Sequence, residues 1–185
     1  VLDRLKVKYV DVFEFHLYGG AGSWKMYKDA VQRIRVFLKD KGYGTIPLWI
    51  GETGTYTGIP RTVDSRKTSL PEQSERAQAE DIIKRYVYAA ALGIERVFWA
   101  FGVMEGFDYQ DSDFDHMGLI YSGLWENDPG FGIKKLGYYS FKMMTGKLEG
   151  SDFSRVETLS DGKDGIYAFK FLKAGKPVYV LWREE

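Results

Sequence analysis

The stretch Pro47-Leu-Trp-Ile-Gly-Glu-Thr-Gly54 decides how this chain is expected to fold. Its apolar run, 46–50, is short and almost continuous, which is typical of a strand buried on both faces. A polar loop follows over 55–70, and a helix with a regular apolar stripe is predicted over 71–92. Another apolar segment, 96–101, predicts a second buried strand. Two strands joined by a helix indicate a parallel pair, because the helix carries the chain back to the starting edge of the sheet.

The same order extends toward the N-terminus. Residues 9–17 alternate between apolar and polar positions, which predicts a strand with Glu14, His16 and Tyr18 on one face. Glycines then break the strand, and the amphipathic pattern over 24–40 predicts a helix. We therefore expect a parallel sheet of three strands joined by crossover helices.

The spacing of the apolar residues changes after Gly146, from the period of a helix to the alternation of strands. A last helix is predicted over 132–145, and three alternating segments with a hairpin turn at 174–176 then predict antiparallel strands. These strands cover 153–159, 165–173 and 177–183. We place a boundary here, between an α/β part, 1–146, and a small antiparallel β-domain, 147–185.

The first residues of the sequence have the spacing expected near the end of a helix. The first residue is Val1, and Leu2 and Leu5 stand at helical spacing, as at the end of a helix. A natural chain start usually shows Met or a helix-capping residue. We therefore expect these residues to be a fragment, a processed product or part of a longer polypeptide.

Composition argues against several classes of protein. The 26 basic and 26 acidic residues cancel, so no charge excess points to nucleic acid or to an anionic membrane. The absence of cysteine excludes disulfides, thiolate metal sites and cysteine nucleophiles. No apolar run approaches the roughly 18–20 residues of a membrane helix, and we expect a soluble protein.

Side chains suited to chemistry gather at the carboxyl ends of the predicted strands, where parallel sheets and barrels place their active sites. Glu52 is the most informative of them, because a carboxylate that ends an apolar strand must be paired or used in chemistry. A neighbouring Tyr or His would keep it ionised by donating a hydrogen bond, as a carboxylate nucleophile requires. The alternative is a strand-end Glu that only caps a loop.

Five motifs, in order and at suitable spacings, resemble the sixth strand through the last helix of a clan A glycoside hydrolase. They are Asp11-Val-Phe-Glu-Phe-His-Leu-Tyr-Gly19, Pro47-Leu-Trp-Ile-Gly-Glu-Thr-Gly54, Ser74-Glu-Arg-Ala-Gln-Ala-Glu80, Val97-Phe-Trp-Ala-Phe101 and Leu136-Gly-Tyr-Tyr-Ser-Phe-Lys142. The later segments 167–171 and 178–182 resemble the β-domain often appended to such enzymes. The resemblance implies an α/β fold, strands six to eight of a TIM (β/α)8 barrel followed by a β-domain, and hydrolysis with retention of anomeric configuration.

The resemblance also implies roles for single residues, and no cofactor. Glu52 matches the nucleophile at the end of strand seven, which attacks the anomeric carbon and forms a glycosyl-enzyme intermediate. His16 and Tyr18 match strand-six residues that orient the nucleophile and touch the sugar. Trp99 matches the strand-eight aromatic on which the sugar at the cleavage point stacks, with ordinary packing in the barrel core as the alternative.

The pattern lacks the second carboxyl group of the retaining mechanism. That group stands about 5–5.5 Å from the nucleophile, and in this clan it lies at the end of strand four, which is not in this chain. A complete barrel takes about 250 residues. We therefore expect a partner that covers the open sheet edges, either the missing N-terminal half or an oligomer of the chain. Alone, the chain is expected to hydrolyse glycosides inefficiently.

Three further glutamates are candidates for supporting roles. Glu14 lies deeper on the strand that bears His16, which favours a hydrogen-bonded structural role. Glu105 and Glu126 lie in or after the loop that follows the third strand, where each is either a substrate contact or a solvated charge. The solvated alternative is favoured for both, and Glu105 is kept as a candidate substrate-binding residue.

Aspartates alternate between 108 and 115, and alternate aspartates can bind calcium, so we compare this segment with a calcium-binding loop. The segment fails as an EF-hand loop: counted from Asp111, the sixth position is His116 instead of Gly and the twelfth is Ser122 instead of Glu. We expect no metal site, with a calcium ion that only staples the loop as the alternative. His116 is expected to be a solvated loop residue.

Three functions are compatible with these patterns. The chain is part of a retaining glycosidase with a carbohydrate substrate, a non-catalytic carbohydrate-binding protein that uses Trp49, Trp99 and Trp125, or a structural half-barrel that oligomerises. The loops 55–70 and 102–128 would shape the sugar subsites, but loop composition does not encode which sugar binds.

Overall fold

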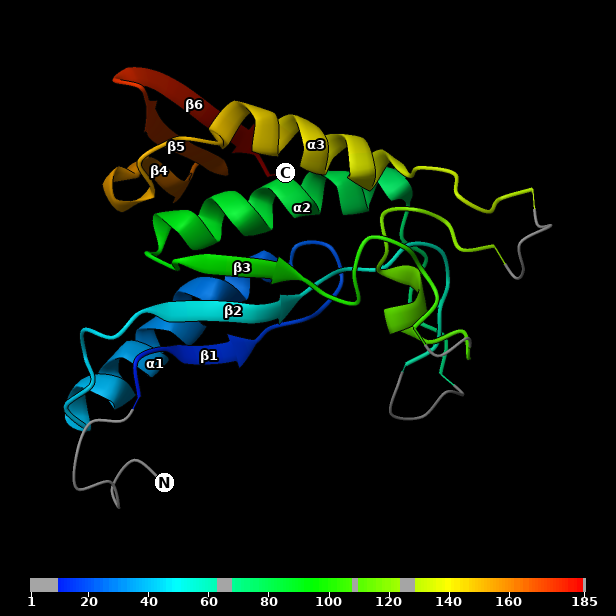
Figure 1. The fold of residues 1–185 in the computed structure, drawn as a ribbon, viewed down its shortest axis with the longest axis horizontal. Helices are drawn as coiled ribbons and strands as arrows, with labels where there is room; N and C mark the ends of the chain where they lie inside the picture. Colours follow the sequence, from blue (N-terminus) through cyan, green and yellow to red (C-terminus); the bar gives the residue numbers. More distant parts are fainter. Residues whose placement is uncertain (1–9, 63–67, 108–109, 124–128, 185) are drawn as a thin grey trace.

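The computed structural model describes residues 10–62, 68–107, 110–123 and 129–184. Its centre is a sheet with the strand order β1-β2-β3, formed by β1 (Phe13–His16), β2 (Leu48–Thr53) and β3 (Arg96–Trp99). Both pairs are parallel, which confirms the predicted parallel sheet. All three strands point toward one group of loops, on the right in Figure 1. The helix end expected around Leu2 and Leu5 lies outside the described residues.

Three α-helices accompany this sheet: α1 (Tyr27–Asp40), α2 (Glu75–Ala91) and α3 (Leu136–Leu148). A 3-10 turn, η2 (Ser23–Met26), leads directly into α1, so the two together cover the helix predicted over 24–40. The start of α2 is later than predicted, because the Ser74 hydroxyl accepts the N–H of Ala77 at 3.1 Å and makes Ser74 the N-cap.

The bounds of α3 also differ from the predicted 132–145. Residues before it form a turn in which the Ile133 N–H donates to the Gly130 carbonyl at 3.1 Å, so the helix starts only after Lys135. At its other end α3 continues through Gly146 to Leu148. Across the described ranges, no helix combines the length and the apolar character that crossing a bilayer requires.

A second sheet is antiparallel, with the order β4 (Glu157–Lys163), β5 (Ile166–Lys173) and β6 (Lys176–Arg183). The predicted hairpin turn is confirmed: Ala174 and Gly175 have φ values of 47° and 76°, the left-handed backbone that a tight two-residue turn requires. The strand predicted over 153–159 is wrong in its first half. There the Asp152 carboxylate accepts the Ser154 N–H at 3.0 Å, and a 3-10 turn forms instead.

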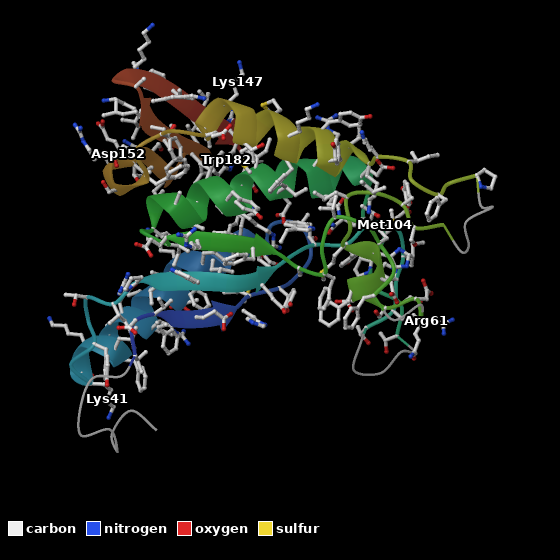
Figure 2. The ribbon with its side chains drawn as sticks, in the orientation of Figure 1. Lys41, Arg61, Met104, Lys147, Asp152 and Trp182 are labelled. Atoms are coloured by element: carbon white, nitrogen blue, oxygen red, sulfur yellow. The ribbon has the colours of Figure 1, made fainter. Side chains whose placement is uncertain are left out.

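The two sheets share one hydrophobic core. The Trp24 ring, fully buried in η2 just before α1, makes edge contacts with Tyr88 of α2 and with Tyr167 and Trp182 of the second sheet. Figure 2 shows Trp182 between β6 and the helices. Ion pairs surround this contact, and Glu184 lies 2.6 Å from Lys25 Nζ. The antiparallel sheet is therefore packed on the helices that cover the parallel sheet.

The two faces of the parallel sheet differ in burial. On one face Leu48 and Ile50 are fully buried in the core that the helices complete. On the other face Glu14 and His16 are exposed, and so is Phe98, which keeps 47% of its surface. The prediction that β2 and β3 are buried strands, β2 on both faces, is wrong for the described residues, because they contain nothing that covers this open face.

Candidate active site

A bulge at Gly51 decides where Glu52 lies. The pairing with β1 runs from Phe15 opposite Ile50 to His16 opposite Glu52, so Gly51 is an extra residue on β2. Without it, strict alternation from the buried Ile50 would turn Glu52 toward the helices. With it, Glu52 joins His16 on the open face.

The Glu52 carboxylate is held by two side chains from the end of β1. The Tyr18 hydroxyl donates a hydrogen bond to Glu52 Oε2, and His16 Nδ1 lies 3.3 Å from the same oxygen. The Glu52 side chain keeps 37% of its surface exposed, so a ligand has access to it. The structure thus brings together three of the residues that the sequence marks as a site.

Glu14 completes the cluster from deeper in β1. Its Oε1 lies 2.8 Å from His16 Nε2, so the imidazole stands between two carboxylates. The Glu14 carboxylate lies over Gly51, where an added Cβ would stand 1.8 Å from Oε1. Glu14 thus contacts His16, and the hydrogen-bonded structural role expected for it stays a prediction.

A buried polar network supports β2 from the opposite face at the same level. Thr53 Oγ1 donates to the Leu17 carbonyl and accepts from Arg85 Nη1 on α2, each at 2.8 Å. Arg85 also donates to the Gly19 carbonyl at 2.9 Å and is ion-paired with Asp81, and both charged side chains are at most 1% exposed. Burial raises the pKa of the Asp81 carboxyl, and Arg85 acts against that rise. The network fixes the loop that carries Tyr18.

Aromatic side chains surround Tyr18 and adjoin a pocket. The Tyr18 ring stacks on Phe101 at 6.4 Å and contacts Phe114 at 5.2 Å between ring centres. Phe101 has φ 55°, a left-handed backbone that costs about 1–3 kcal/mol in a non-glycine residue and tends to occur at functional sites. Tyr18 and Phe114 also line a pocket of about 700 Å³, together with Tyr56 and Leu70 of the 55–70 loop. Flat apolar rings beside a pocket are surfaces on which a sugar ring can stack.

Trp99, at the end of β3, is half-buried. Its indole N–H donates to the Met117 carbonyl at 2.8 Å. Met117 directly follows the 3-10 turn η3 (Asp113–His116), so the bond ties the strand end to the loop beyond it. Stacking of Trp99 on a sugar stays a prediction.

Glu105 lies in a buried ion pair. Its Oε1 is 2.5 Å from Lys135 Nζ, which also lies 2.7 Å from Thr57 Oγ1. Burial raises the pKa of the Glu105 carboxyl and lowers that of the Lys135 ammonium, and the two charges oppose these shifts in each other. The solvated alternative is therefore wrong for Glu105. The sequence carries no local signal for this pair, because its members are 30 positions apart.

The aspartate-rich loop forms its own contacts. His116 Nε2 lies 2.9 Å from Asp111 Oδ1, and the His116 side chain is partly exposed. Asp111 also pairs with Arg61 at 3.7 Å, and Figure 2 shows Arg61 among the loops beyond the strand ends. Trp125 and Glu126 lie outside the described residues. Within the described ranges, no three histidine or acidic side chains converge as a metal site requires.

Comparisons with known proteins bear on the fold. No protein-family model and no curated protein matches this sequence. A solved family 39 glycoside hydrolase from Bacteroides cellulosilyticus WH2 aligns with all of the chain at a TM-score of 0.65 and 18% identity. A solved glucosidase from Croceicoccus marinus aligns with 88% of the chain at a TM-score of 0.55 and 13% identity.

The chain has a glycoside hydrolase-like fold. It spans 36% of the length of the first protein and 32% of the second. At these identities the likeness concerns the path of the backbone, that is, a mixed α/β arrangement with one parallel and one antiparallel sheet.

Proposed function

We propose that this chain is the nucleophile-bearing part of a retaining glycoside hydrolase, with Glu52 as the nucleophile and a carbohydrate as the substrate. The observation that carries the proposal is the Glu52 carboxylate, held by Tyr18 and His16 at the carboxyl end of a parallel sheet. The glycoside hydrolase-like fold supports it. A strand-end Glu that only caps a loop would not need an open face and two partners on one oxygen.

We assign different tasks to the two oxygens of Glu52. Tyr18 and His16 both contact Oε2, which leaves Oε1 to attack the anomeric carbon. As the Oε1–carbon bond forms, the bond from that carbon to the leaving oxygen breaks, and the leaving group takes a proton from the second carboxyl group. Water then hydrolyses the glycosyl ester with retention. A carboxylate held in one rotamer loses little orientational freedom in the attack.

The sugar is proposed to lie over the open face and the adjoining pocket. His16 and Tyr18 would contact it beside Glu52, and Trp99 would supply a flat apolar surface. Tyr56 and Phe114 extend the aromatic lining away from the strand ends. Glu105 would act indirectly, because its pairing with Lys135 braces the loop that follows β3.

The second carboxyl group is proposed to come from the polypeptide that completes the barrel. Within the described residues β1 and β3 each have one unpaired edge. A groove of about 620 Å³ runs beside β3, lined by apolar side chains that include Phe98 and Met144. Covering these surfaces would take an interface on the order of 2,000 Å² or more. The span 1–146 would then be strands six to eight of the barrel, with 147–185 as the appended β-domain.

Sedimentation velocity combined with intact-mass analysis tests this partner. The chain is expected to sediment as an oligomer, or together with a second polypeptide. A folded monomer of the chain's own mass, stable without any partner, would contradict the incomplete barrel.

Replacing the nucleophile tests the assignment of Glu52. In the longest natural polypeptide that contains these residues, Glu52→Gln is expected to lower kcat/KM by more than about a thousandfold, because the amide is isosteric but not nucleophilic. Glu95→Gln is the matched control, since Glu95 belongs to the same sheet region and accepts the Trp49 indole N–H at 3.1 Å, outside the cluster. Activity of the Glu52→Gln protein within about tenfold of the parent would contradict the assignment.

A further inference from the structure

The imidazole of His16 bridges carboxylates of two different strands. Its Nε2 lies 2.8 Å from Glu14 Oε1, and its Nδ1 lies 3.3 Å from Glu52 Oε2. We propose that Glu14 is a positioning residue, which fixes the ring and the proton of His16 so that Nδ1 faces the nucleophile. The inference rests on the proposed function, because it gives Glu14 a task only if Glu52 attacks the sugar.

The chemistry of imidazole decides which ring nitrogen of His16 carries the proton of the neutral form. A neutral ring has one N–H and one bare nitrogen, and a bare nitrogen lone pair facing a carboxylate is unfavourable. The contact to Glu14 is the shorter of the two, so we place the N–H of the neutral ring on Nε2, on the side of Glu14. Any second proton on the ring then lies on Nδ1, where it is donated to Glu52. Glu14 thereby directs the positive charge of the protonated ring toward the nucleophile.

Gly51 makes this arrangement possible. The extra residue of the bulge faces the open side, and a Cβ there would stand 1.8 Å from Glu14 Oε1 and 2.4 Å from its Cδ. Only glycine leaves room for the Glu14 carboxylate beside the ring. Gly51 therefore has two effects. Its bulge turns Glu52 onto the open face, and its missing side chain leaves room for the Glu14 carboxylate that orients His16.

The remaining groups near His16 do not replace Glu14. The Tyr18 ring stands edge-on at 6.2 Å between ring centres, and its hydroxyl is already donated to Glu52. Within the part of the chain that the structure describes, the ion-pair and ring contacts of the imidazole are with Glu14 on β1, Tyr18 after β1 and Glu52 on β2. Among the described residues, Glu14 is the carboxylate that lies beside Nε2.

Long-range ¹H–¹⁵N correlation of the imidazole rings tests the proposal on the 185-residue chain itself. The chain has two histidines, so His116→Gln assigns both sets of signals. When the ¹⁵N shifts show a neutral His16 ring, the parent is expected to carry its proton on Nε2. Glu14→Ala is expected to move that proton to Nδ1, where Glu52 is the remaining acceptor.

Two further variants separate positioning from a general loss of structure. Glu14→Gln keeps an acceptor oxygen and is expected to retain the proton on Nε2. Gly51→Ala keeps Glu14 but displaces its carboxylate, and is expected to give the pattern of Glu14→Ala. Glu95→Gln removes a carboxylate from the same sheet region, and should leave the His16 signals in the parental pattern.

Parental ¹⁵N shifts of His16 in Glu14→Ala, with the fold intact by circular dichroism, would overturn the proposal. Glycosidase activity plays no part in this measurement. A failure of Glu52 as nucleophile would therefore appear only in turnover, and a failure of Glu14 as positioning residue only in the ring signals.

Discussion

The two faces of the parallel sheet are formed by the same three strands but differ in burial and in the side chains that they carry. The closed face buries Ile50 and Leu48 completely and holds the Arg85–Asp81 ion pair at no more than 1% exposure. The open face carries His16 in contact with both Glu14 and Glu52, while part of each side chain stays accessible. Burial and charge pairing on one side thus provide the rigid support on which the exposed cluster is held.

The bulge at Gly51 is where the two faces are coupled. It sends Glu52 to the open face and returns Thr53 to the closed one, where the Thr53 hydroxyl accepts from Arg85 at 2.8 Å. The position of the candidate nucleophile therefore depends on a hydrogen bond made by its neighbour inside the core. Variants on each face test this dependence.

The largest effect on stability is expected from Arg85→Met. The change leaves the Asp81 carboxylate buried without its counter-charge, and breaking a buried pair in this way costs about 3–5 kcal/mol of unfolding free energy. Urea denaturation at neutral pH measures the loss. The double variant Arg85→Met with Asp81→Leu removes both charges, and is expected to recover part of it. Equal instability of the single and double variants would show that the unpaired charge is not the cause.

A matched pair of truncations compares the faces directly. Ile50→Ala on the closed face is expected to lower the free energy of unfolding by about 2–5 kcal/mol, through lost burial and the cavity left behind. Phe98→Ala on the open face is expected to cost less than about 1 kcal/mol wherever no partner covers it, because nearly half of that residue is exposed within the chain itself. Similar costs for the two variants in denaturation experiments would mean that the open face is covered in solution.

The smallest effect concerns the ion pairs that hold β6 on the helices of the closed face. Glu184 lies 2.6 Å from Lys25 Nζ and 2.7 Å from Lys84 Nζ. Burial raises the pKa of its carboxyl, but the two ammonium groups outweigh burial and the pKa lies below its usual value. A lowered pKa in the folded state stabilises the fold above the usual value of about 4.3, and this contribution is lost as the pH falls through the lowered pKa.

Glu184→Gln is therefore expected to cost up to about 1 kcal/mol at pH 7. The difference from the parent should shrink as the pH falls below about 4.3. Denaturation curves at several pH values measure this difference. A difference that stays constant down to the acid limit would mean that Glu184 acts through packing and not through its charge.

The sequence was sufficient to predict the parallel sheet and the region of the site. Apolar strands separated by amphipathic helices have few other solutions, and parallel strands bring their carboxyl ends to one edge. That is why His16, Tyr18 and Glu52, which are far apart along the chain, were expected together. The bulge was missed, although a glycine inside a strand pattern is a known signal for one.

Other features depend on contacts that no local pattern encodes. Glu105 is buried because Lys135 reaches it from another segment, and the ring cluster around Tyr18 depends on the left-handed backbone of Phe101. Phe98 keeps 47% of its surface exposed within the described residues. An apolar strand predicts burial on both faces only when the residues that cover both faces are present.

Trapping the covalent intermediate tests the central claim most directly. Activated 2-deoxy-2-fluoroglycosides carry a leaving group that departs without an acid catalyst, so the glycosyl-enzyme accumulates when the nucleophile is present. We expect a panel of such sugars to add one fluoroglycosyl unit to the longest natural polypeptide that contains these residues. Peptide mapping is expected to place the adduct on Glu52, and Glu52→Gln should abolish it. Labelling of a different carboxylate, or no labelling by any sugar of the panel, would contradict Glu52 as the nucleophile.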